Sequence, residues 1–183
     1  MAAKLSTKKD IDKLVGREIF FDANILIYLF WPTAADSEKL EKIYAAAFGQ
    51  LLKQKNILVA DFITISEFIN RAFRIEYEKY KSSKKLYSIK FKEYRNTEEG
   101  REVLNDIYVK VKEDIFKRFD VATQKFFKHD IEKLLIVDSL DFGDKGILKI
   151  CKENNYVLLT HDADFKNSDI DILTSNASIL ITE

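Results

Sequence analysis

The chain has 183 residues, of which 46% are hydrophobic and 33% charged, and its 30 basic and 30 acidic side chains balance. This composition is typical of one globular domain with a sizeable core, and it excludes a general polyanion-binding protein. No apolar run is long enough to cross a bilayer. Cys151 is the only cysteine, so an intrachain disulfide and a multi-cysteine zinc site are excluded. Since residues 1–9 also lack the apolar core of a secretory signal, we expect a cytoplasmic protein.

Strands and helices alternate in the first part of the chain. Residues 18–22 are predicted to form a buried strand, and 24–31 an apolar helix that ends at Pro32. Apolar side chains at helical spacing predict an amphipathic helix over 36–54. A second buried strand is predicted over 57–60. The next helix is expected to begin at Thr64.

The rest of the chain begins with a highly charged helical segment at about 74–117, which we interpret as a helix-rich insertion in a single domain, 1–183. The elements predicted after it are a short strand at 119–121, a helix over 123–137, a helix capped by Asp141 and ending near 154–155, a clear strand at 156–160, and a last strand at 170–173 or 179–181. Alternating strands and helices with short joints predict an α/β fold, a three-layer α/β/α sandwich with a mainly parallel central sheet.

Acidic residues stand at four turns of this predicted fold. Asp22 and Asp162 each follow an apolar strand, Glu67 lies early in a helix, and Asp144 begins one. Because the carboxyl ends of parallel strands share one edge, we expect these side chains to converge there. Clustered carboxylates repel one another unless a cation neutralises them. The set therefore indicates a hard divalent metal and phosphate chemistry.

Each acid also has a structural interpretation. Thr64 to Glu67 fits a capping box, and taken alone Glu67 favours that role. Asp144 suits the positive end of a helix, and Asp141 is favoured as the N-cap of the same helix. One of Asp162 and Asp164 is able simply to organise a turn.

The sequence lacks the motifs that other kinds of catalytic site require. It contains no Gly-rich phosphate loop, no nucleophile elbow and no pair of histidines at metal-ligand spacing. His129 is interpreted as a surface residue and His161 as incidental, although His161 stands beside Asp162. The acidic set is therefore the best candidate for chemistry.

Basic and aromatic side chains alternate between Lys79 and Arg95. Such a pattern is able to bind a nucleic-acid backbone and stack on bases. The alternative, which we favour, is a solvated helix face whose aromatic rings turn into the core. The candidate RNA-binding residues in this stretch are Lys84, Lys85, Lys90 and Lys92.

Four motifs in this order resemble the PIN domain, the nuclease fold of VapC-type toxins from toxin–antitoxin pairs. They are Phe21 to Tyr28, Ile65 to Phe68, Asp144 to Cys151, and Val157 to Phe165. The resemblance implies a Mg²⁺- or Mn²⁺-dependent endoribonuclease. Its partners would be RNA, a cognate antitoxin and a second copy in a homodimer, with no membrane contact.

Carried over by position, the resemblance assigns the catalytic carboxylates Asp22, Glu67, Asp144 and Asp162. Asp22, Asp144 and Asp162 would hold the metal. Asn24 and Thr160 would be supporting polar residues, with Asp164 as an extra acid.

Two alternative functions remain open at this stage. One is a catalytically inactive PIN-like domain that binds or regulates. The other is a phosphatase or phosphoacceptor domain, because Asp162-Ala163-Asp164 faintly resembles a two-aspartate phosphatase motif. That motif lies near the C-terminus rather than near the start of the chain, which disfavours the phosphatase.

Overall fold

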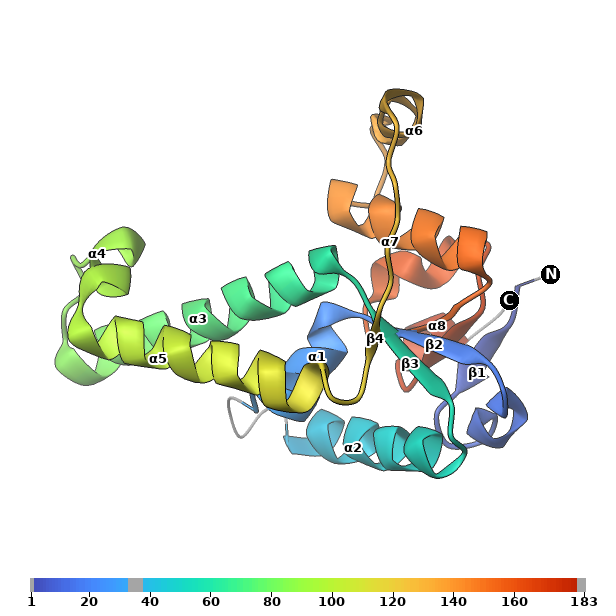
Figure 1. Ribbon diagram of the computed structural model, residues 1–183, viewed down its shortest axis with the longest axis horizontal. Coiled ribbons are helices and arrows are strands. Elements are labelled where there is room, and N and C mark those ends of the chain that lie inside the picture. Colours follow the sequence, from blue (N-terminus) through green and yellow to red (C-terminus); the bar gives the residue numbers. More distant parts are fainter. Residues whose placement is uncertain (1, 33–37, 181–183) are drawn as a thin grey trace.

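The protein is described here by a computed structural model that covers residues 2–32 and 38–180. Its centre is a six-stranded sheet in which every neighbouring pair of strands is parallel (Figure 1). The strand order is β1-β6-β5-β2-β3-β4. The strands are β1 (Lys4–Ser6), β2 (Glu18–Phe21), β3 (Ile57–Ala60), β4 (Asp120–Val121), β5 (Val157–Leu159) and β6 (Ile172–Thr174).

Helices cover both faces of the sheet because alternate strand residues point to opposite sides. Phe21 and Leu58 face one layer, where they pack in a hydrophobic cluster with residues from five α-helices. Phe20 and Leu158 face the other. The first layer holds α1 (Ala23–Phe30), α2 (Glu38–Lys53), α3 (Phe62–Lys84) and α5 (Glu98–Lys110), and the second holds α7 (Phe142–Asn154), the short helix η4 (Ala163–Asn167) and α8 (Ala177–Leu180). The predicted three-layer α/β/α architecture is confirmed.

Two parts of the chain extend from this sandwich in Figure 1. The long helix α3 runs outward, turns through α4 (Phe91–Asn96), and returns along α5 and the π-helical turn η3 (Val111–Ile115). We call α3, α4 and α5 the arm. A second, smaller extension carries α6 (Lys128–Leu134). None of the helices in the described part of the chain has the length and apolar character needed to cross a membrane.

Two predicted helices need correction. The third helix begins at Phe62 rather than Thr64, because the buried carboxylate of Asp61 caps it and accepts a hydrogen bond from the Thr64 backbone N–H at 2.8 Å. The helix predicted over 123–137 is wrong except at α6. Its first residues follow Ala122, whose N–H continues the sheet by donating to the Ala60 carbonyl at 2.8 Å, so tertiary pairing overrides helix propensity there.

The edges of the sheet also differ from the prediction. Strand β1 was not expected from the sequence, and the short 3₁₀ turn η1 (Ile11–Leu14) follows it. The last strand is β6, whereas Ile179 lies in α8. Residues 36–37 of the predicted amphipathic helix and residue 181 of the alternative last strand lie outside the described residues.

Candidate active site

The ends of two neighbouring strands bring Asp22 and Asp162 to the same edge of the sheet. Phe21 of β2 is paired with Leu159 of β5, and the Asp22 N–H donates to the Leu159 carbonyl at 3.1 Å. The chain order of the sheet reverses at β2, which has β3 on one side and β5 on the other. Such a switch point is where open α/β sheets bind ligands.

Asp22 is buried, with 5% of its surface exposed, and is held by hydrogen bonds on one oxygen. Its Oδ2 accepts a bond from the Thr160 hydroxyl at 2.5 Å and another from Asn24 Nδ2 at 2.7 Å. The Thr160 hydroxyl oxygen in turn accepts from the Asp162 N–H at 2.9 Å. Asn24 and Thr160 therefore orient Asp22.

Burial raises the pKa of Asp22 to about 6, against the opposing effect of the Thr160 hydrogen bond. The charges of Glu67 and Asp162 raise it further. Asp22 thus lies close enough to Glu67 and Asp162 for their negative charges to raise its pKa.

Asp144 lies in the first turn of α7. Its N–H donates to the Asp141 carboxylate at 2.8 Å, which confirms the prediction that Asp141 caps this helix. Burial raises the pKa of Asp144 to about 7, and repulsion from Asp141 adds to the effect. Asp22, Asp162 and Glu67 contribute in the same direction. The positive end of the helix favours a charged carboxylate, so burial and repulsion outweigh the helix dipole here.

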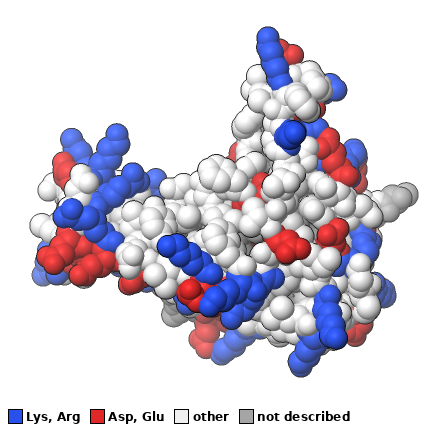
Figure 2. Space-filling model, viewed as in Figure 1, with Lys and Arg blue, Asp and Glu red and all other residues white. Residues whose placement is uncertain are grey.

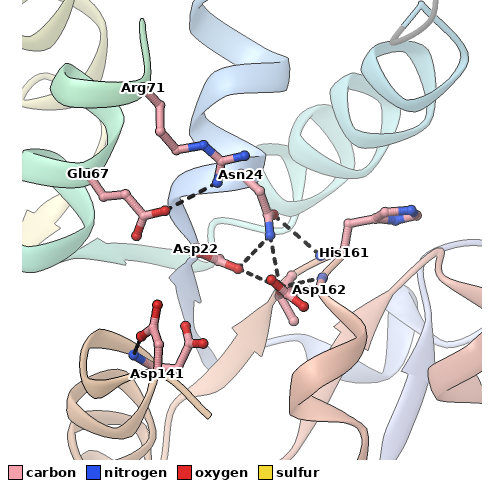
Figure 3. Close-up of polar contacts among 9 residues, drawn as sticks. Asp22, Asn24, Glu67, Arg71, Asp141, His161 and Asp162 are labelled. Atoms are coloured by element: carbon pink, nitrogen blue, oxygen red, sulfur yellow. Dashed lines mark hydrogen bonds and ion pairs between the residues drawn. The ribbon is translucent and has the colours of Figure 1, made fainter. Parts of the chain in front are cut away.

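Glu67 lies one and a half turns into α3, too far along to be the capping residue that its sequence context suggested. The capping box of α3 is formed by Asp61 and Thr64 instead. The Glu67 carboxylate accepts a hydrogen bond from Arg71 at 3.2 Å, an ion pair that leaves both side chains almost half exposed. In Figure 3, Glu67, Asp22 and Asp141 face a common space between α3, α7 and the strand ends.

The remaining predicted site residues are Asp162 and Asp164, and His161 directly precedes them in the sequence. The Asp162 carboxylate accepts a bond from the Asp164 N–H at 3.0 Å, so it also organises the turn into η4, whereas Asp164 itself is exposed. The His161 ring points away from the carboxylates (Figure 3). Its Nδ1 lies 2.8 Å from the Tyr44 hydroxyl, and burial lowers its pKa. A neutral His161 therefore belongs to the packing of α2 against the sheet.

The four candidate RNA-binding lysines lie around the far end of the arm. Lys84 ends α3, 17 residues after Glu67, which places it about 25 Å along the helix. Lys84, Lys85, Lys90 and Lys92 are all exposed. They are therefore not part of the acidic space.

Arg71 was not among the predicted site residues, and Figure 3 places it over Asn24 and beside Glu67. The available signal was its spacing, because residues four apart lie on one face of a helix and a Glu followed by an Arg at that spacing forms an ion pair. What the spacing did not show is that this face of α3 points into the site.

A divalent metal is the group that such a site implies, and the donor set suits one in charge and chemistry. Carboxylate oxygens are ligands for a hard cation. The surroundings of Asp22 and Asp144 raise their pKa values, and a bound cation would favour the charged form of both. Across residues 2–32 and 38–180, no three His, Cys, Asp or Glu side chains are placed to hold an ion as they stand.

Comparison with known proteins gives one result. The family model described as PIN domain matches residues 19–170, more than half of the chain. No curated protein and no solved structure matches. PIN domains have a nuclease-type fold, are generally nucleases and typically bind divalent metals. The chain belongs to the PIN domain family.

Proposed function

We propose that this PIN domain is a Mg²⁺- or Mn²⁺-dependent endoribonuclease that hydrolyses RNA phosphodiester bonds. The observation that carries the proposal is the electrostatic coupling of carboxylates from distant parts of the chain. Burial is the largest cause of the raised pKa of Asp144, and the charges of Asp141, Asp22, Asp162 and Glu67 raise it further. Such a concentration of negative charge is costly for a folded protein, and a cation relieves it.

The proposed roles follow from the positions of the side chains. Asp22 and Asp144 would hold the ion, and Asp162 and Glu67 would hold a second ion or the waters around the first. When bound, a divalent ion supplies Lewis acidity, which activates a water and stabilises negative charge on the phosphate. Asn24 and Thr160 fix the oxygen of Asp22 that they contact.

Arg71 adds a positive group to the same space. Its guanidinium pairs with Glu67 at 3.2 Å and remains about half exposed, so it is free to donate to a phosphate oxygen of the substrate. We expect it to bind the phosphate backbone next to the cleaved bond.

The test is cleavage of single-stranded RNA by the purified protein with Mn²⁺ or Mg²⁺ and with a chelator. We expect cleavage only with the ion, and its loss in Asp22→Asn, because the amide keeps the size of the side chain and removes its charge. Circular dichroism verifies that the variant is folded. Ion-dependent cleavage by a well-folded Asp22→Asn protein would count against the assignment, and the absence of any cleavage by the wild type would favour a binding domain.

For the role in the cell, we propose the toxin of a VapBC-type pair, on the resemblance to VapC-type toxins. Such a toxin needs a surface for its antitoxin, and exposed apolar side chains lie beside α6, next to the helix that carries Asp144. Leu135 is 68% exposed and Val137 fully exposed. Expression of the wild type should arrest bacterial growth, and expression of Asp22→Asn should not. Normal growth with an active wild-type enzyme would favour a processing nuclease. The size of the purified protein in solution tests the proposed homodimer.

A further inference from the structure

A cluster of aromatic rings packs α4 against α3 in the outer part of the arm. Phe91 of α4 lies 5.3 Å from Phe73 and 5.2 Å from Tyr77 of α3, measured between ring centroids. Tyr94, which is 1% exposed, stacks on Phe73 at 5.1 Å. Most aromatic side chains of the basic segment are thus used for packing, as the favoured interpretation predicted, and Tyr87, at 71% exposed, is the exception.

Two arginines lie against this cluster. The guanidinium carbon of Arg74 is 5.0 Å from the centroid of Phe91, and that of Arg95 is 5.4 Å from the same ring. The two guanidinium groups are therefore at most about 10 Å apart. Aromatic faces attract cations, so the ring holds both side chains in place.

These arginines differ from others in having no acidic partner. Arg17, Arg71 and Arg118 each form an ion pair with a carboxylate. Among the described residues, no carboxylate lies within 4 Å of Arg74 or Arg95. Two positive groups are thus ordered within about 10 Å of each other on the surface, with no acid within 4 Å of either, an arrangement that suits phosphate groups.

The helical repeat aligns this pair with the candidate active site. Arg74 follows Glu67 by seven residues on α3, so it lies on the same face about 10 Å farther along the helix. Arg71, which pairs with Glu67, lies between them. Arg71, Arg74 and Arg95 therefore form a row, the arginine row, that leads from the acidic space onto the arm.

More positive charge lies beyond the row. Lys90 and Lys92 flank Phe91 in the sequence, are exposed, and like Arg74 have no ion-pair partner among the described residues. Figure 2 shows Lys and Arg gathered over the end of the arm that carries α4. A strand that leaves the acidic space along α3 would thus meet positive charge along the row and again at the end of the arm.

We propose that the arginine row binds the backbone of the RNA strand that leads away from the cleaved phosphate, with Lys90 and Lys92 beside it. This inference rests on the proposed function and assigns its substrate-binding surface. The distance of about 10 Å from Glu67 to Arg74 equals the rise of about three stacked nucleotides at 3.4 Å each. RNA that ends within two nucleotides of the cleaved bond is too short to reach Arg74 and Arg95.

The test measures binding without cleavage, in a chelator, using fluorescently labelled single-stranded RNA of 12 nucleotides over a range of salt concentrations. The variant is the double substitution Arg74→Gln and Arg95→Gln. We expect its affinity for the 12-mer to fall about tenfold at low salt. The slope of log affinity against log salt should decrease by about 1.4, because each phosphate that is no longer neutralised lowers it by about 0.7.

The control is Lys39→Gln with Arg118→Gln, which removes two positive charges from exposed positions on α2 and after η3. It should bind the 12-mer as the wild type does. Replacing Arg74 and Arg95 by Lys should restore most of the salt slope, because lysine carries the same charge. It lacks the planar guanidinium group that binds a phosphate through two hydrogen bonds. An unchanged slope in the Gln double variant, or an equal loss in the control, overturns the inference.

The binding result and the cleavage result are separable. If the protein cleaves RNA with Mn²⁺ but the Gln double variant binds the 12-mer normally, the arginine row is wrong and the proposed function stands. If the salt slope falls as expected but no RNA is cleaved with any ion, the row binds RNA on a domain that is not a nuclease.

Discussion

At the scale of single residues, the candidate site depends on how a buried carboxylate is kept ionised. Asp22 is almost fully buried, yet burial raises its pKa only to about 6, because the Thr160 hydroxyl donates to it at 2.5 Å. Hydrogen bonds to a charged group favour the charged form. The Thr160 hydroxyl thus helps to set the pH above which Asp22 is charged.

Replacing Thr160 by valine removes this donor and keeps the shape of the side chain. A hydrogen bond to a charged group contributes about 1.5–3 kcal/mol, so the pKa of Asp22 should rise by about one unit or more. We expect the acidic limb of the pH profile of kcat/KM for RNA cleavage to move to higher pH by a similar amount. Thr160→Ser keeps the hydroxyl and should leave the profile in place. Identical profiles for the valine variant and the wild type would show that Thr160 does not act through Asp22.

Asp144 gives a prediction about stability in the absence of metal. Its folded pKa of about 7 lies above the ordinary value of 3.8, so the folded state binds the proton more tightly than the unfolded state. Stability from this group is therefore full below about pH 4 and is lost as pH rises toward 7. Asp144→Asn removes the titration and should raise the melting temperature in a chelator at pH 8 more than at pH 5.

The same experiment with Mg²⁺ added separates the two roles of Asp144. The ion should raise the melting temperature of the wild type at pH 8 and have little effect on Asp144→Asn. A variant that loses stability at pH 8 in the chelator would instead show that Asp144 is mainly a favourable charge at the start of α7.

At the scale of elements, the buried strands and their flanking caps were predictable because the information is local. β2 and β5 are short apolar runs, and Asp22 and Asp162 follow them directly. Asp141 stands three residues before Asp144, the spacing of an N-cap bond. These features need only neighbouring residues, so the sequence alone located them.

Other elements depend on partners far away in the chain. β1 has the sequence Lys4-Leu5-Ser6, with no apolar run, and becomes a strand because it pairs with β6 more than 160 residues later. The arginine row could not be predicted from the sequence for the same reason. Arg74 and Arg95 gain a common neighbour only when α4 packs on α3, and periodicity does not show which helices will pack together.

The turn between α4 and α5 requires a glycine at position 100. Gly100 lies in the first turn of α5, where a Cβ atom would be 2.1 Å from the backbone oxygen of Tyr94 and 2.9 Å from its carbonyl carbon. Backbone atoms of a packed helix have no rotamer that avoids such a clash. Only glycine allows α4 and α5 to approach this closely.

Gly100→Ala should therefore destabilise the protein by about 1–3 kcal/mol, as overpacking does. Gly49→Ala is the matched control, since Gly49 is inside α2 and a Cβ there would meet nothing within 4 Å. It should instead stabilise by about 0.5–1 kcal/mol, because alanine favours helix. Denaturant unfolding measures both changes. Equal stability of Gly100→Ala and the wild type would mean that α4 is not held against α5.

At the scale of the whole molecule, one sheet separates two hydrophobic clusters, and the candidate site joins them at its edge. Asp22 begins α1 on one side, whereas Asp144 belongs to α7 on the other. An ion held by both carboxylates would connect the layers. Binding only to the folded state stabilises the whole fold by RT ln(1 + [L]/Kd).

Cys151 makes this linkage measurable because it is the only cysteine and lies on α7 with none of its surface exposed. Burial raises the pKa of its thiol, so a thiol reagent should react only after the protein opens. Mg²⁺ at 100 times its Kd should stabilise the folded state by about 2.7 kcal/mol and slow labelling about 100-fold. Mg²⁺ is suited to this test because it prefers oxygen ligands and leaves the thiol itself unaffected.

The variants decide whether the protection comes from the candidate site. In Asp144→Asn, Mg²⁺ should no longer slow the labelling of Cys151, because one of the two carboxylates that would hold the ion has lost its charge. Asp130→Asn is the control, since Asp130 pairs with Lys149 on the outer side of α7, away from the acidic space, and its substitution should leave the protection by Mg²⁺ intact. If Mg²⁺ at concentrations that support cleavage left the labelling rate of the wild type unchanged, the ion would not connect the two layers.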